Sequence, residues 1–134
     1  MGGRGVYSSA GGFTSYEYEA EEDRIGGYKV IHNEKHKNKG LPEYSNSPNT
    51  IYFWRGDKGY IGQMRVYDSH RRSHISIEWN HAHDGIPPGT AHIQKYRIGP
   101  DGHPERYGKA TRLSRYYIKK YGDLLKEAFP DIKF

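Results

Sequence analysis

The chain has 134 residues, 34 % of them hydrophobic and 28 % charged, with 21 Lys and Arg against 16 Asp and Glu and no cysteine. This length indicates one domain, and the missing cysteine excludes a disulfide scaffold, a thiolate metal site and a cysteine nucleophile. The sequence lacks a run of about 18 apolar residues, so we expect a cytoplasmic protein with no membrane span and no membrane partner.

Basic charge is concentrated in the body of the chain. Residues 1–27 carry two basic and five acidic side chains, whereas residues 28–134 carry 19 basic and 11 acidic ones. A basic body attracts polyanions, most often RNA or DNA, although a solvated surface accounts for the same charge. We therefore separate a leader, residues 1–27, from a single basic domain, residues 28–134.

The N-terminal third offers weak structural signals. Residues 1–12 are rich in glycine and poor in apolar side chains, so we expect them to be flexible. Residues 15–25 are predicted to form a short acidic helix that ends at Gly26 and Gly27. A short strand is expected over residues 28–31 and a loop over residues 32–44.

Residues 50–98 alternate between extended segments and turn residues. Their β-branched and aromatic content predicts strands over residues 50–55, 60–67, 74–79 and 90–98, separated by segments that contain Gly, Pro, Asp, Asn and Ser. Strands that follow one another through short connections pair with their neighbours. This region is therefore predicted to form an antiparallel meander.

The C-terminal region has helical spacing instead. Apolar residues from Leu113 to Ala128 recur every three or four positions and form one stripe. Ser114 is a suitable N-cap, and Pro130 ends the helix. A helix packed on one face of a four- to five-stranded antiparallel sheet gives an α+β fold whose other face is open.

Alternation along the predicted strands gathers ionisable side chains on the open face. The polar positions are Arg65 on one strand, His74 and Glu78 on the next, and His92 on the last. A carboxylate and an imidazole across a small gap can act as general base and general acid, and an arginine can hold a phosphate. We predict that Glu78 takes the proton of an RNA 2′-hydroxyl and His92 protonates the leaving 5′-oxygen. Arg65 would clamp the phosphate and His74 would exchange roles with either, with no cofactor.

Aromatic and basic side chains complete the predicted RNA site. Tyrosine rings on the strands can stack on bases, and basic residues near them can contact phosphates. The candidates are Tyr52, Tyr67, Tyr96, Arg71, Arg72, Lys95 and Arg97. The alternative is an ordinary solvated sheet face, on which cross-strand pairs of Glu with His or Arg contribute only about 0.2–1 kcal/mol each.

A second constellation lies in the loop that contains His81 and His83. Two histidines one residue apart can bind one metal ion, and His92, His74 or Asp84 could complete a zinc or manganese site. The spacing is weakly specific, because His and Asp in such a loop also serve turn hydrogen bonds. A metal-dependent enzyme therefore stays an alternative to metal-independent cleavage.

Several short motifs resemble a cassette of phages and polymorphic toxins. They are Met64–Asp68, Ile77–Trp79, His83–Gly85 and Pro88 to His92, together with the segment Gly2–Gly5, which resembles the leaders of proteins encoded beside phage portal and head genes of Gram-positive bacteria. The cassette carries an aspartate where this chain has Glu78, and a second histidine where it has Gln94. This departure puts a histidine-pair metal site in doubt more than acid/base catalysis.

The resemblance implies an accessory protein of a prophage and a ribonuclease toxin domain of the barnase, EndoU, colicin or RelE-like type. Its partners would then be RNA and an immunity protein. The alternative is a phage-associated protein without enzymatic activity that binds nucleic acid or a structural protein of the virion.

Overall fold

The computed structural model describes residues 4–8, 15–33 and 40–134, with side chains from residue 18 onward. In this part of the chain, eight strands form one sheet in sequence order, and one helix follows them. The strands are β1 (Arg4–Ser8), β2 (Ser15–Ile25), β3 (Tyr28–His32), β4 (Ile51–Arg55), β5 (Ile61–Tyr67), β6 (Ser73–Glu78), β7 (His92–Ile98) and β8 (Pro104–Arg112), and the helix is α1 (Arg115–Ala128). All neighbours pair antiparallel except β3 and β4, which are parallel.

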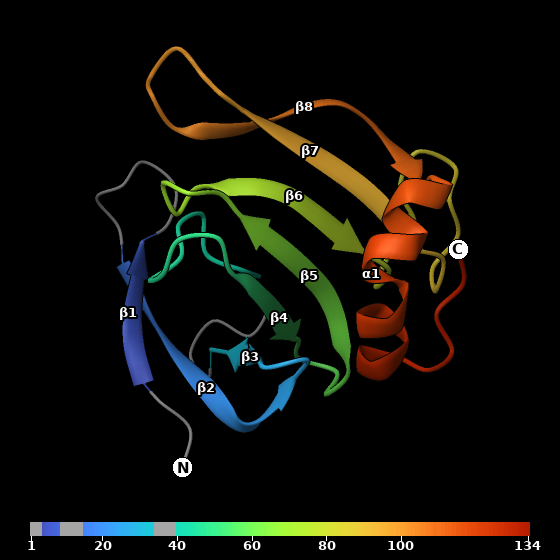
Figure 1. The fold of residues 1–134 in the computed structure, drawn as a ribbon, viewed down its shortest axis with the longest axis horizontal. Coiled ribbons are helices and arrows are strands. Elements are labelled where there is room, and N and C mark those ends of the chain that lie inside the picture. The colour runs from blue at the N-terminus through green and yellow to red at the C-terminus, as the bar shows by residue number, and fades with distance from the viewer. Residues whose placement is uncertain (1–3, 9–14, 34–39) are drawn as a thin grey trace.

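Helix α1 packs its apolar stripe on one face of the sheet. Figure 1 shows a strongly curved sheet with α1 lying beside the ends of β5, β6 and β7. Tyr121 and Leu125 of α1 belong to one buried core with Phe53, Met64 and Ile77 of the sheet. The predicted α+β class and the C-terminal helix on one sheet face are therefore confirmed.

The opposite face is partly covered, although the sequence predicted it to be open. A second core on β2 to β5 contains Tyr18, Ala20, Ile31, Leu41, Tyr52, Trp54 and Tyr67. The segment that follows residue 39 crosses this face, where the Pro42 carbonyl accepts a hydrogen bond from Tyr67 Oη. Four buried polar residues, Ser76, Glu78, His92 and Gln94, lie farther along on β6 and β7.

Two predictions about the elements are wrong. The sheet has eight strands rather than four or five, because β1, β2 and β8 join the predicted set. Residues 15–25, predicted as an acidic helix, form β2, in which Tyr18 and Ala20 are buried and Glu19 between them is not. The alternate burial of Tyr18 and Ala20 and the pairing with β1 and β3 outweigh the helical preference of the glutamates.

In the N-terminal segment, β1 pairs with β2 and β2 pairs with β3. Residues 1–3 and 9–12 of the predicted flexible stretch, and residues 34–39 of the predicted loop, lie outside the described residues, as do residues 13 and 14. Along the described chain, no helix has the length and apolarity needed to cross a membrane.

Candidate metal centre

Glu78 and His92 lie side by side on neighbouring strands. Glu78 ends β6 and His92 begins β7, and they are direct Cα partners in the antiparallel ladder. The same row continues to Gln63 on β5 and to Arg112 on β8. Directly paired residues project to the same sheet face, so the register alone brings the carboxylate and the imidazole together.

The loop between β6 and β7 adds His81 and His83 to this pair. Asp84 and Gly85 form its tip with φ angles of 51° and 82°, as a two-residue turn of the Asp-Gly type requires. His83 and Ile86 exchange both backbone hydrogen bonds across this turn, at 3.1 and 2.9 Å. His83 is therefore held by a small hairpin.

The base of this loop is tied to the C-terminal segment. The amide of Ala91 donates to the carbonyl of Lys133 at 2.7 Å, and the amide of Lys133 donates to the carbonyl of Gly89 at 2.9 Å. Ile132 beside them is buried in the main core. The loop that carries His81 and His83 is consequently anchored at its tip and at its base, which keeps the histidines near Glu78.

The four side chains form one compact group. One ligand atom each of Glu78, His81 and His92 lies within 4.8 Å of the other two, and His81 Nε2 is 3.7 Å from Glu78 Oε2. The ring of His83 is centred 5.4 Å from that of His92 and 5.8 Å from that of His81. His92 and Glu78 lie deepest, whereas the side chains of His81 and His83 are 41 % and 35 % exposed.

The imidazole of His92 has an unusual environment. Only 1 % of the residue is exposed, and neither ring nitrogen has a well-aligned hydrogen-bond partner among the described residues, although the backbone of Thr90 is near enough to raise its pKa slightly. Burial lowers the pKa of His92, and the nearby Glu78 carboxylate only partly opposes this effect. A buried donor or acceptor without a partner costs about 1–3 kcal/mol, so a neutral ring of this kind needs a reason to be kept.

Neighbouring groups orient the ligand atoms. Arg106 Nη2 donates to Glu78 Oε1 at 3.0 Å, and Gln63 Nε2 donates to Oε2 at 3.3 Å. His81 Nδ1 pairs with Asn80 Oδ1 at 2.6 Å. In the tautomer that donates from Nδ1 to this amide oxygen, the Nε2 lone pair of His81 is available to a metal ion beside Glu78. Such outer contacts fix the tautomer and direction of a metal ligand.

The dimensions suit one transition-metal ion. Two ligands at about 2.1 Å from a tetrahedral ion lie about 3.4 Å apart. The ligand atoms of Glu78, His81 and His92 lie within 4.8 Å of one another, so small side-chain shifts would bring them to this spacing. Two imidazoles and a carboxylate are typical of a catalytic zinc site, which keeps one position open. His83 stands beside this set as a further imidazole.

Two members of the predicted catalytic group lie elsewhere. A register shift between Val66 and Tyr67 pairs Ser73 rather than His74 with β5, and the exposed His74 lines a pocket with tyrosines of α1. Arg65 is buried, and its guanidinium donates to Ser76 Oγ at 2.6 Å and to the carbonyls of Leu41 and Pro42 at 3.2 Å. The bulge removes His74 from the group, and these bonds leave Arg65 unable to clamp a phosphate.

The predicted stacking tyrosines are mostly enclosed. Tyr52 and Tyr67 are 2 % and 1 % exposed, their rings are 5.1 Å apart, and Tyr52 Oη accepts from the Asn46 amide. Neither can stack on a base. Tyr96 is half-buried under the guanidinium of Arg65, 5.2 Å from its ring centroid.

The predicted basic contacts stay on the surface, away from the cluster. Arg71 and Arg72 belong to the turn between β5 and β6, where Arg72 pairs with Asp68. Lys95 and Arg97 are exposed on β7, and Arg97 pairs with Glu105.

Sequence reasoning missed three residues that contact the cluster. Arg106 and Gln63 bind Glu78, and Asn80 binds His81. Arg106 lies on β8, a strand that the sequence did not predict. The dipeptide that Asn80 forms with His81 was visible in the sequence, but only the fold turns both toward Glu78. No family model matches the chain, and neither a curated protein nor a solved structure matches it.

Proposed function

We propose that the protein is a divalent-metal-dependent ribonuclease whose reaction centre is the cluster of Glu78, His81, His83 and His92. The observation that carries this proposal is the fully buried His92 ring, whose two nitrogens have no well-aligned partner among the described residues and which offers a ligand atom within 4.8 Å of those of Glu78 and His81. A polar ring in that state is costly in a merely structural role, and metal coordination removes the cost.

The residues divide into ligands and groups that face the substrate. Glu78, His81 and His92 would hold the ion, which supplies a Lewis acid for a phosphoryl oxygen. The Arg106 side chain is 47 % exposed beside Glu78, so it can contact the same phosphate. His83 can accept the proton of the 2′-hydroxyl as that oxygen attacks phosphorus. The bond from phosphorus to the 5′-oxygen breaks, and this oxygen takes a proton from solvent.

Charge around the centre favours a polyanionic substrate. Arg106, Lys109 and Arg112 are exposed along β8, the edge strand of the sheet next to the cluster. Lysine and arginine on an edge strand also discourage pairing with other chains, so this charge supports the substrate class without identifying it. The resemblance to toxin cassettes points in the same direction, to RNA.

The test measures metal binding and RNA cleavage together. Chelator-treated protein is incubated with labelled single-stranded RNA, alone and with Zn²⁺ or Mn²⁺, and the ends of the products are identified. We expect cleavage only with metal, and 2′,3′-cyclic phosphate ends. Glu78→Gln and His92→Gln should abolish metal binding and cleavage, while His74→Ala, which removes an exposed histidine outside the cluster, should change neither.

Other outcomes would overturn the proposal. Cleavage that persists in chelator and fails in Glu78→Gln would support metal-independent acid/base chemistry. Binding of RNA without cleavage under any condition would support a non-enzymatic nucleic-acid-binding protein. Cleavage of DNA at a rate equal to that of RNA would exclude the 2′-hydroxyl as the nucleophile. Toxicity on expression, relieved by Glu78→Gln, is the expected result in cells.

A further inference from the structure

A pocket lies next to the metal cluster, where β5 begins and β6 ends. It has a volume of about 270 Å³ and lies between the β4–β5 turn and the start of the β6–β7 loop. Its walls include Trp54, Asp57, Lys58, Tyr60, Gly62 and Asn80. Pockets for drug-sized ligands begin at about 300 Å³, so this one has room for a single planar ring system and no more.

Asn80 belongs to both the pocket and the cluster. Its side chain lines the pocket, and its Oδ1 atom is 2.6 Å from His81 Nδ1. Gly62 makes this position available, because a Cβ atom at residue 62 would lie 2.6 Å from Asn80 Cβ. Only the side chain of Asn80 therefore separates a molecule bound in the pocket from His81, a metal ligand of the proposed site.

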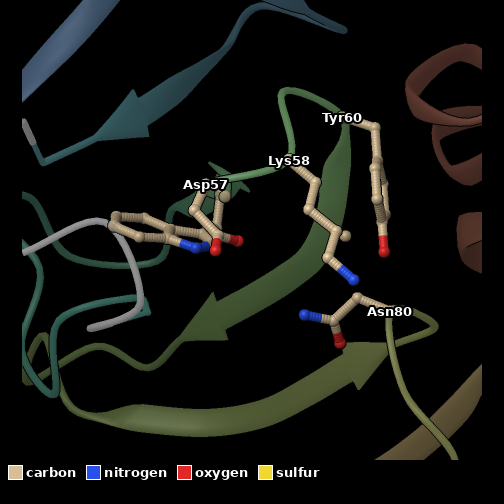
Figure 2. Close-up of a pocket in the computed structure, with 7 residues that line it drawn as sticks. Asp57, Lys58, Tyr60 and Asn80 are labelled. Carbon is tan, nitrogen blue, oxygen red and sulfur yellow. The ribbon is translucent and has the colours of Figure 1, made fainter.

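Polar groups converge on the pocket from three directions. Figure 2 shows the ammonium of Lys58, the hydroxyl of Tyr60 and the amide of Asn80 directed toward the same space. The ring of Tyr60 packs against Phe129 at 5.7 Å between centroids. An amide can donate and accept, and the ammonium only donates. This combination matches a ring with both donors and acceptors on its edge and a phosphate nearby.

The aromatic wall is rigid. Trp54 is only 3 % exposed, and Tyr18 packs edge-on against its ring at 5.9 Å. The other tryptophan, Trp79, is 1 % exposed and donates its indole N–H to the carbonyl of Ile61 at 2.9 Å. Both indoles are almost fully buried, and of the two only that of Trp54 borders the pocket.

We propose that this pocket binds one nucleobase of the RNA strand whose phosphate lies at the metal cluster. The inference rests on the proposed function, because the neighbouring phosphate site gives the pocket its substrate. Unpaired RNA bases are recognised by aromatic side chains and by hydrogen bonds to their edges. The small volume, the half-buried ring of Tyr60, and the amide and ammonium supply these elements, and the shared Asn80 places the base next to the reacting phosphate.

The experiment uses the indole N–H signals of the full chain. Trp54→Phe removes one of the two signals and thereby assigns both. AMP, CMP, GMP and UMP are titrated separately, with ribose 5-phosphate as the probe that lacks a base. We expect at least one nucleotide to move the Trp54 signal while the Trp79 signal stays, and ribose 5-phosphate to move neither. Lys58→Ala should weaken that nucleotide about tenfold, and Lys119→Ala, an exposed lysine of α1, should not.

The failures of the two proposals are distinguishable. The titration is repeated on Glu78→Gln, which lacks the metal site but keeps the pocket. If the Trp54 signal still responds while no metal-dependent cleavage exists, the base pocket stands and the reaction fails. If metal-dependent cleavage exists but the Trp54 indole signal does not change with any nucleotide, or changes equally with ribose 5-phosphate, the proposal that this pocket binds a nucleobase is wrong.

Discussion

Replacing His92 with leucine should stabilise the metal-free protein. The ring of His92 is 1 % exposed and both its nitrogens are without well-aligned partners among the described residues, so the folded state bears the cost of burying them. Leucine has a similar volume and no polar atoms. Removing the unpaired polar atoms should recover about 1–3 kcal/mol.

The size of the effect in a melting experiment follows from the length of the chain. An unfolding entropy of about 2.1 cal/mol/K per residue makes 1 kcal/mol worth about 3.6 °C for 134 residues. His92→Leu should therefore melt about 4–11 °C above the wild type in chelator. Wild-type protein with metal at 100 times its Kd should gain about 2.7 kcal/mol, or about 10 °C, and the variant should gain nothing.

The decisive result is that metal raises the melting temperature of the wild type and leaves that of the variant unchanged, which closes or reverses the difference seen in chelator. Thermal unfolding followed by circular dichroism, with and without Zn²⁺, measures all four melting temperatures. A variant less stable than the wild type in chelator, together with a wild type that does not respond to Zn²⁺, Mn²⁺ or Co²⁺, would refute the reasoning. His74→Leu, at an exposed position, is the control and should shift stability by no more than about 0.5 kcal/mol.

Three further predictions concern neighbouring positions. Asn80→Ala removes the group that fixes the His81 tautomer, so metal affinity measured by chelator competition should fall about 10- to 100-fold. Gly62→Ala places a methyl group 2.6 Å from Asn80 Cβ and should destabilise the fold by about 1–3 kcal/mol in urea unfolding. Partial burial by itself would raise the pKa of Asp68, but hydrogen bonds from the amides of Arg72 and His70 and from the Arg72 guanidinium outweigh it and lower the pKa. Because the pKa of Asp68 is lower in the folded state, its carboxylate stabilises the fold fully at pH values above the unfolded-state pKa of about 3.9, and this stabilisation is lost as pH falls through the folded-state pKa. Asp68→Asn should therefore lower the free energy of unfolding by about 1 kcal/mol at pH 7 and leave it unchanged at the acid end of a pH series.

Each of these variants has a matched control. Asn46→Ala, which removes an exposed side chain, should leave metal affinity unchanged, and an equal loss in both asparagine variants would contradict the orienting role of Asn80. Gly56→Ala meets its nearest neighbour at 3.5 Å, so it should be close to neutral. A stability difference between Asp68→Asn and wild type that does not shrink toward low pH would show that the carboxylate charge is not the source.

The part of the site predicted from the sequence is the part that depends on local pairing. Alternation, clean over residues 74–79 and interrupted by Lys95 and Arg97 over residues 90–98, put Glu78 and His92 on polar faces, and the meander made them neighbours. Alternation failed for His74, because a bulge at Val66 and Tyr67 shifts the pairing. It also could not reveal that Arg65 is enclosed by carbonyls of the segment that crosses the sheet.

The sequence by itself determined the central meander and the C-terminal helix, because each of these depends on a periodicity of 2.0 or 3.6 residues that is written locally. Only the tertiary structure decided that His81 and His83 meet Glu78 and His92, and that Arg106 reaches across from β8. These contacts depend on the path of a loop anchored by the C-terminal segment and on the curvature of an eight-stranded sheet. Such long-range geometry results from packing summed over the whole chain, and no short window of residues encodes it.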